Sequence, residues 1–532
     1  MSSGDVPETR VVPDKTQLIS PLVEVPSPSL NRSSSPGLAD NIRVALQEHF
    51  WYWGIVLVIA VLVFSIIRDL RMKLWMDEIF TVYMARQPNI TQIIEAIKEG
   101  CDGAPPLYAI IVHWLLPIVR NEALAARLPS TLGFGCMMIC LLAVCRRRLG
   151  AIYAVIAMLF VCYTSLYYAS EGRSYGMVLG CGGVALLSWQ MATERRRRPL
   201  AITLFAGSLA FMVALHYYAI FFLVPLFVAE LVRAWEVRKP DPAILAAMLP
   251  AVFTLTLHYP LIVAWRPYLV HFYSPANLFS FWPFYVQYLS PLLPACLIAL
   301  LLFAVLPEPV LHKATKSSIP KPEGVAICIL VLMPIFVNVA ALYTTHAFLN
   351  RYLLWTTMGF GLLAAAGFSN AEHSRIGVGV AILGLMVGSL LLSGISAILA
   401  PPELRFGNEL ASQELKTLPD SADPIVIPSG SLFLELSYYS ESPLRNRFVF
   451  IEQPDLAVKY WKTDTSQLLL AALAHRTDFR VEDVKVILRK YPRFIVVVST
   501  EDFLIGYLLR LGYKVTPIDA IKTPVLYEVI GT

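Results

Sequence analysis

Long uninterrupted apolar runs are the feature that most limits what this chain can fold into. Of its 532 residues, 57% are hydrophobic and only 15% are charged. A membrane-spanning helix needs about 20 predominantly apolar residues, because the hydrocarbon core is about 30 Å thick and backbone groups inside it must bond within their own helix. We count about eleven such runs by this length criterion. The sequence therefore predicts an α-helical, polytopic membrane protein.

The predicted spans cover most of residues 51–399, and the first of them is 51–67. The later spans are 128–145, 150–168, 175–192, 199–215, 217–233, 243–264, 285–306, 324–343, 353–368 and 376–399. Beyond them, short apolar runs alternate with amphipathic stretches, which is typical of a small α/β domain. We expect a disordered tail over residues 1–45, a transmembrane domain over 46–400 and a soluble α/β domain over 401–532.

The basic residues orient these spans. Cytoplasmic loops of membrane proteins carry an excess of Lys and Arg. Such clusters lie at residues 146–148, 195–198, 233–239 and 313–321, and all of them face the cytoplasm if the N-terminus does too. That topology requires residues 103–117 to lie along the outer face without crossing. It also places the first long loop, residues 69–127, and the C-terminal domain on the external side.

The first external loop begins with two adjacent carboxylates, Asp77 and Glu78, directly after a membrane-length run. One interpretation is a solvated helix start, because acids are favourable near a helix N-terminus. The other is a catalytic site, in which one carboxylate is a general base and nearby cations hold an anionic leaving group. An amphipathic stretch over residues 89–100 follows, and we expect it to lie in the membrane interface as a helix that stops at Gly100.

The predicted topology places several further ionisable residues on the same external side. Each one taken alone is equally consistent with a boundary side chain that extends towards water. Their convergence on one face favours a functional site. Besides the acid pair, the residues concerned are Arg127, Glu171, Arg173, His216, Arg266, His346 and Arg351.

Several short motifs occur in an order that is more specific than any one of them. They are Asp77-Glu78, Pro105-Pro106-Leu107-Tyr108, Arg127-Leu128-Pro129-Ser130, the stretch YASEGRSY over 168–175, and Asn350-Arg351-Tyr352. In these motifs the chain resembles the polyisoprenyl-phosphate-dependent GT-C glycosyltransferases. That group includes dolichyl-phosphate-mannose protein mannosyltransferases and bacterial transferases that add aminoarabinose to lipid A.

The resemblance implies that a sugar moves, with inversion, from a polyprenyl-phosphate carrier such as undecaprenyl phosphate to an acceptor hydroxyl or phosphate. The acceptor would be a glycan, a lipid or a protein on the external face. The predicted cytoplasmic tail and external C-terminal domain favour a bacterial inner membrane with a periplasmic site, and an ER membrane stays open as the alternative. Asp77 would be the base and Glu78 would orient the acceptor or the loop. The candidate ligands of the carrier phosphate and sugar are Arg127, Arg173, Arg351, Tyr108, Tyr175, His216, Glu171 and Tyr352.

Other readings stay open at this point. Where the aminoarabinose branch has a basic residue, this chain has Gly103-Ala104, so that donor is disfavoured. No cofactor is required, although a divalent metal near Asp77 and Asp102 is an alternative. A transporter or flippase of a lipid-linked saccharide, or a polysaccharide-assembly subunit, also fits many spans with boundary charges. The stretch over residues 431–444 is compatible with docking over the site. No basic stripe indicates a nucleic-acid partner.

Overall fold

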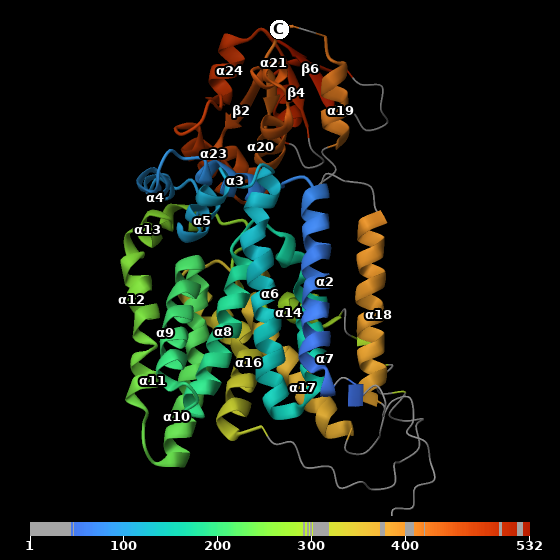
Figure 1. Cartoon of the computed structure of the whole chain (residues 1–532). Helices are drawn as coiled ribbons and strands as arrows, with labels where there is room; N and C mark the ends of the chain where they lie inside the picture. Colours follow the sequence, from blue (N-terminus) through green and yellow to red (C-terminus); the bar gives the residue numbers. More distant parts are fainter. Residues whose placement is uncertain are drawn as a thin grey trace, which may run out of the picture.

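The computed structural model describes residues 44–290 apart from 46, the segments 319–372, 378–399, 409–419, 421–498, 503–518 and 525–531, and the single residues 293, 294, 297 and 301. Two regions follow one another along the chain (Figure 1). A bundle of long helices forms the larger region, and a sheet with short helices stands at one end of it. We call that end of the bundle the sheet-facing end. The predicted N-terminal tail lies outside the described residues, apart from Val44 and Ala45.

Seven helical segments among the described residues are long and apolar enough to cross a membrane. Helix α2 exposes Ile59 and Val63 while it buries Val58 and Val61, as expected for a helix with one side against lipid. The predicted class, a polytopic α-helical membrane protein, is confirmed. The seven segments are α2 (Phe50–Arg71), α6 (Glu122–Leu149), α7 (Ala151–Ser165) with η1 (Leu166–Ser170), α8 (Tyr175–Thr193), α9 (Arg198–Leu215), α16 (Lys321–Tyr343), and η5 (Asn350–Thr356) with α17 (Thr357–Glu372).

Helices also lie at the other four predicted spans, but their described parts do not meet the same criterion of length and composition. Prolines interrupt one of these runs, since Pro250 and Pro260 stand near the starts of two short helices. The count of eleven spans therefore stays a prediction. The elements concerned are η2 (Tyr217–Phe222), α10 (Leu223–Val237), α11 (Pro242–Ala246), α12 (Leu249–Leu257), α13 (Tyr259–Ala264), α14 (Phe281–Leu289) and α18 (Val378–Leu399).

Helices α6 and α8 pack with almost no side chain between their backbones. A Cβ atom added at Gly176 would lie 2.2 Å from the carbonyl oxygen of Ser130, and one at Gly180 would lie 2.5 Å from that of Gly133. Small residues permit such close approach of membrane helices. The contact matters for the site, because α6 carries Arg127 and α8 begins just after Arg173.

The segment between α2 and α6 forms three short helices, α3 (Met76–Ala85), α4 (Ile90–Lys98) and α5 (Leu107–Leu115), at the sheet-facing end (Figure 1). Helix α4 begins at the Asn89 cap and stops at Gly100, whose φ of 95° suits glycine. With nine residues, α5 is too short to span the hydrocarbon core. The expected amphipathic helix and the non-crossing helix after it are therefore both present.

The C-terminal region contains a six-stranded sheet in the order β3-β2-β1-β4-β6-β5. The first four strands in this order pair in parallel, and β6 pairs antiparallel with both β4 and β5. Fully buried strands such as β1 (Ile425–Ile427) explain the short apolar runs of the sequence. The other strands are β2 (Phe448–Glu452), β3 (Val481–Asp483), β4 (Arg493–Val497), β5 (Lys514–Pro517) and β6 (Leu526–Ile530).

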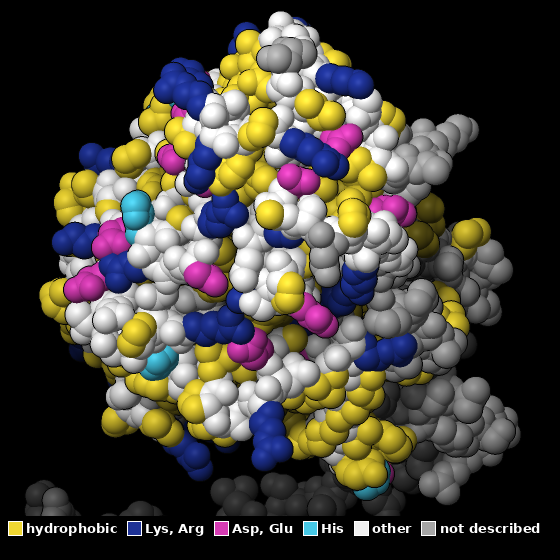
Figure 2. Space-filling model, turned by 90° about the horizontal axis from the view of Figure 1, so that it is seen from above, with side chains coloured by type: hydrophobic (Ala, Val, Ile, Leu, Met, Phe, Trp, Pro, Cys, Tyr) yellow, Lys and Arg dark blue, Asp and Glu magenta, His cyan; other side chains and the backbone are white. Residues whose placement is uncertain are grey.

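Short helices surround this sheet and connect it to the bundle. The α/β character predicted for the end of the chain is confirmed, whereas its exact boundary stays a prediction. Viewed from above in Figure 2, Lys, Arg, Asp and Glu side chains are spread over the face that the C-terminal region forms. The helices are α19 (Glu409–Thr417), α20 (Gly430–Tyr439), α21 (Ser442–Arg445), α22 (Pro454–Trp461), α23 (Thr465–Ala474), α24 (Val484–Lys490) and α25 (Leu504–Arg510).

Candidate active site

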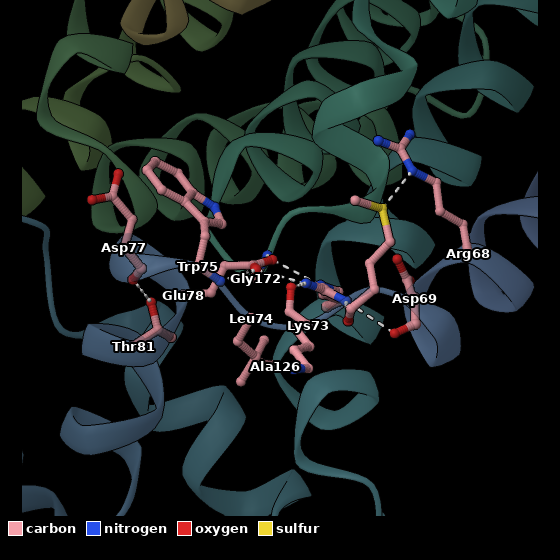
Figure 3. A network of polar contacts seen from close by, with 12 residues as sticks. Arg68, Asp69, Lys73, Leu74, Trp75, Asp77, Glu78, Thr81, Ala126 and Gly172 are labelled. Atoms are coloured by element: carbon pink, nitrogen blue, oxygen red, sulfur yellow. Dashed lines mark hydrogen bonds and ion pairs between the residues drawn. The ribbon is translucent and has the colours of Figure 1, made fainter. Parts of the chain in front are cut away.

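Helix α3 starts in a way that separates the two adjacent carboxylates. Trp75 occupies the N-cap position, and its N–H donates to Oε2 of Glu78 over 3.1 Å. This backbone bond holds Glu78 against the helix start. Successive side chains on a helix point about 100° apart, so Asp77 is directed elsewhere. Figure 3 shows Asp77 pointing away from the polar network around Glu78.

Glu78 forms a buried ion pair with Arg127 of α6. Its Oε1 accepts from Nε over 2.8 Å and its Oε2 accepts from Nη2 over 2.6 Å. The two side chains are 0% and 1% exposed. Oε1 also accepts the N–H of Gly172 over 2.7 Å. This carboxylate therefore joins three segments of the chain: the start of α3, helix α6 and the loop before α8.

The remaining donors of Arg127 bind the end of α2 and the residues after it. Nη1 donates to the carbonyl oxygens of Asp69 and Met72 over 2.9 and 2.8 Å, and Nη2 donates to that of Lys73 over 3.0 Å. A guanidinium has five N–H groups, and all of them are used. The structure thus differs from the predicted role of Arg127 in phosphate binding, because no donor is left for a ligand.

A cavity of about 190 Å³ lies at the sheet-facing end, next to this network. Asp77 and Arg351 face it, as do aromatic rings from the loops that follow α9 and α13. The predicted site residues that line the cavity are Asp77, Arg173, Tyr175, His216, Arg351 and Tyr352. Four other predicted residues are buried in the fold and absent from the lining: Glu78, Tyr108, Arg127 and Glu171.

Asp77 and Arg351 form an ion pair in the lining of the cavity, with 2.8 Å between Oδ2 and Nη2. Their side chains are 18% and 21% exposed, unlike those of the buried pair of Glu78 and Arg127. Nη2 of Arg351 also donates to the hydroxyl of Tyr273 over 3.0 Å. The guanidinium lies over the rings of Trp75 and Tyr175 at 5.7 and 6.0 Å from their centroids. These cation–π contacts hold Arg351 without using its N–H groups, so the N–H groups can exchange their present partners for a ligand.

A second ion pair joins Arg173, in the loop before α8, to Asp102, in the loop between α4 and α5. Nη1 lies 2.7 Å from Oδ2 of Asp102, and it also reaches Thr81 Oγ1 over 3.2 Å and the carbonyl oxygen of Asp77 over 3.4 Å. Burial opposes the charge of Arg173, but the interaction with Asp102 outweighs it, and the pKa of the guanidinium is raised. Arg173 therefore stays charged and fixes the helix turn that carries Asp77.

His216 lies deep in the cavity among aromatic rings. Its ring centroid is 4.7 Å from that of Tyr352 and 5.8 Å from that of Tyr175. Burial, together with the charges of Arg173 and Arg351, lowers the pKa of His216 from 6.5 to about 3. The imidazole is neutral near pH 7, so it can donate or accept a hydrogen bond to a ligand but adds no charge.

Some lining residues escaped the sequence analysis. Trp265 stacks on Tyr268 with 4.2 Å between ring centroids, and the pair covers the loop that carries Asp102. A Cβ atom at Gly103 would come within 2.4 Å of the Trp265 ring. In the sequence, Gly103 is the residue that could have indicated this close contact with an aromatic ring. Helix α23 supplies two further lining residues, Thr465 and Leu469, for which the sequence offers no signal.

The predicted docking of residues 431–444 involves the start of α3, which the cavity borders. Tyr439 of α20 accepts the N–H of Leu74 over 2.5 Å, and Tyr438 donates to Glu122 over 2.5 Å. Helix α20 supports the acid pair from outside, whereas α23 reaches the cavity. Arg266 and His346, also expected on this face, are exposed and do not line the cavity.

A metal ion does not fit this arrangement. Within the described part of the chain, no group of three or more His, Cys, Asp or Glu side chains is placed to hold one. Asp77 and Asp102, the two acids considered above, are each engaged by an arginine. An arginine at the carboxylate competes with a cation, and a third ligand is missing.

No protein-family model matches the sequence, and neither does any curated protein. The structure is similar to two crystal structures of ArnT from Cupriavidus metallidurans. The one bound to undecaprenyl phosphate shares 13% identity with a TM-score of 0.55, over 90% of this chain and 98% of that chain. The apo one shares 13% identity with a TM-score of 0.56, over 89% and 97%.

The chain has the GT-C glycosyltransferase fold. The predicted fold class and the resemblance are thereby confirmed at the level of architecture. Because both chains are covered almost completely, the shared GT-C fold includes the helical bundle and the C-terminal sheet region together. The roles predicted for individual residues remain to be tested.

Proposed function

We propose that this protein is a membrane glycosyltransferase that moves a sugar from a polyprenyl-phosphate carrier to an acceptor in the cavity. The observation that carries the proposal is the ion pair between Asp77 and Arg351, partly exposed on a cavity within a GT-C fold. It places a candidate base and a cation side by side on one cavity. The similarity to an ArnT structure bound to undecaprenyl phosphate supports the carrier class.

Arg351 is the proposed ligand of the carrier phosphate. A guanidinium binds phosphate through paired, charge-assisted hydrogen bonds. In the structure, Asp77 Oδ2 lies 2.8 Å from one of these nitrogen donors, Nη2, as an ion pair. An incoming phosphate takes over the donor and releases the carboxylate. The released carboxylate is then available to act as the base.

The reaction then follows from the released carboxylate. Asp77 takes the proton of the acceptor hydroxyl as its oxygen bonds to the anomeric carbon of the sugar. The bond between that carbon and the phosphate oxygen breaks on the opposite face, which inverts the configuration. The electron pair of the broken bond stays on the phosphate oxygen, and Arg351 stabilises the added charge.

Two groups of residues next to the cavity hold the start of α3, and with it Asp77, in position. Arg173 holds the turn of α3 through Thr81 and the carbonyl oxygen of Asp77, and Asp102 keeps Arg173 in place. Glu78 and Arg127 fix the start of the same helix from its buried side. Tyr175, Tyr352 and the neutral His216 form the wall against which the sugar packs.

The proposed setting is a bacterial inner membrane. The basic clusters predict a cytoplasmic N-terminus, and the cavity and the C-terminal region then face the periplasm. Arg147 and Arg148 at the end of α6 pair with Glu194 at the opposite end of the bundle from the cavity, which is consistent with that orientation. The partners are the carrier-linked sugar, an acceptor glycan, lipid or protein, and the bilayer, with no nucleic acid.

The test uses purified protein in nanodiscs with a panel of undecaprenyl-phosphate sugars, and free undecaprenyl phosphate is followed by mass spectrometry. Wild type is expected to release the carrier from one donor, while Asp77→Asn is not. A matched control is Asp478→Asn, which removes an exposed acid of the C-terminal region that does not line the cavity. Binding of a donor without release in the presence of acceptor extracts, combined with its movement across the bilayer, would favour the transporter reading instead.

A further inference from the structure

The charges that line the cavity cancel within the described residues. The charged side chains in the lining are Asp77, Asp102, Arg173 and Arg351, which form two ion pairs. The imidazole of His216 is neutral near pH 7 for the reasons given above. The described lining of the cavity therefore has a formal charge of zero.

A bound carrier changes the formal charge of the cavity. The phosphodiester that links a sugar to its carrier has one negative charge, and no positive charge in the lining remains to cancel it. The loaded cavity is therefore negative by one, with the released carboxylate of Asp77 at the reacting side. A phosphate monoester would add about 1.5 to 2 further negative charges near pH 7. In a partly buried site such charges repel strongly, since the effective dielectric constant is about 20 or lower.

The surfaces left for an acceptor are aromatic and hydroxylic. The segment after α13 contributes Trp265, Phe272 and Tyr273, and α23 contributes Thr465 and Leu469. Thr465 Oγ1 contacts the carbonyl oxygen of His271 over 3.4 Å, so this wall is continuous from the bundle to the C-terminal region. Rings with a few hydroxyl groups suit an uncharged, hydroxyl-rich ligand.

Contacts with the helical bundle hold α23 at both of its ends, next to the cavity. At its start, Asp464 Oδ2 lies 3.2 Å from Nδ1 of His271. Just beyond its end, Arg476 forms an ion pair with Glu99 of the loop after α4, with contacts of 2.5 and 2.8 Å. These contacts tie α23 to two different loops of the bundle. The helix therefore acts as a fixed wall, and its side chains can select what enters beneath it.

We infer that the acceptor enters as an uncharged, hydroxyl-bearing sugar, not as a phosphate, and that it lies beneath α23 against Thr465 and Leu469. The inference rests on the proposed function and narrows its acceptor class. It also separates this chain from any enzyme of the same fold that transfers to a phosphate group. The hydroxyl supplies the proton that Asp77 removes, whereas an ionised phosphate oxygen would need no base.

The experiment measures binding of two matched probes, phenyl β-D-glucoside and its 6-phosphate, to protein in nanodiscs. Each titration is done with and without undecaprenyl phosphate. We expect the carrier to weaken binding of the 6-phosphate by about tenfold or more, and to leave binding of the neutral glucoside unchanged or tighter. Equal or tighter binding of the 6-phosphate to the loaded protein, or no binding of the neutral glucoside, would overturn the inference.

Two variants test separately the charge of the cavity lining and the contact of the acceptor with α23. Asp102→Asn makes the formal charge of the lining more positive by one, so it should raise the affinity of the loaded protein for the 6-phosphate several-fold, and by more than it changes the affinity for the neutral glucoside. Asp478→Asn is the control outside the cavity and should change neither probe. Thr465→Val should weaken the neutral probe several-fold without changing carrier affinity, and an unchanged probe affinity would remove α23 from the site. Failure of the carrier itself to bind would count against the proposed function, which is a different result.

Discussion

Asp77 and Glu78 are neighbours in the chain, yet their ion pairs have opposite characters. Glu78 and Arg127 are almost completely buried, and every donor of the guanidinium is used. Asp77 and Arg351 face a cavity, and their side chains keep about a fifth of their surface exposed. One pair is closed to ligands and the other is open. An ion pair can act in binding only where one partner can be exchanged for a ligand, and that depends on the space around it.

The largest expected effect comes from breaking the closed pair. Glu78→Gln leaves the charge of Arg127 buried without its partner, which typically costs about 3–5 kcal/mol. We expect a large fall in the melting temperature and poor recovery of folded protein. Glu122→Gln is the matched control, because its pair with Arg86 is about 40% exposed and such pairs contribute about 1 kcal/mol or less. Similar melting temperatures for the two variants would contradict the expected difference in stability between a buried and an exposed ion pair.

Breaking the open pair on its acidic side should affect chemistry and not folding. Asp77→Asn removes the proposed base, so turnover should fall by about 10²–10⁴-fold. The same change removes the carboxylate that competes with phosphate for Arg351, and carrier affinity should therefore rise. The measurements are single-turnover release of carrier and direct titration with undecaprenyl phosphate. A loss of carrier affinity would show that Asp77 positions the ligand and does not compete with it.

Breaking the open pair on its basic side should weaken the carrier. Arg351→Ala removes the proposed phosphate ligand, and we expect carrier affinity to fall about tenfold or more, since a hydrogen bond to a charged group contributes about 1.5–3 kcal/mol. Arg351→Lys should keep part of the affinity, because a lysine retains the charge but not the paired geometry. Unchanged carrier affinity in both variants would exclude Arg351 from phosphate binding.

The smallest expected effect is a pH dependence of folding stability, which comes from His216 in the wall of the cavity. The unfolded chain protonates His216 near pH 6.5, whereas the folded protein does so near pH 3. The unfolded state therefore binds more protons between these values, and wild-type stability should fall as pH decreases through that window. His216→Asn lacks this contribution, so the difference between its melting temperatures at pH 7.5 and 5 should be smaller. An equal difference in both proteins would contradict the burial of a neutral imidazole.

Part of the site could be predicted from sequence, and part could not. Asp77, Arg173 and Arg351 were expected to converge from their places in the predicted topology, and they all line the cavity. Arg127 was expected there for the same reason, but its side chain turns into the bundle. The topology predicts which side of the membrane a residue lies on. It does not predict which way its side chain points within a packed helix.

Thr465 and Leu469 show the limit more clearly. They lie almost 400 residues from Asp77 in a region that has no catalytic motif, and only the packing of the sheet region on the bundle brings them to the cavity. The fold class, the helical positions and the α/β character of the C-terminal region follow from apolar run length and hydrophobic period, which are local properties of the chain. The choice between a closed and an open ion pair, and the wall formed by α23, depend on contacts between distant segments, so only the tertiary structure decided them.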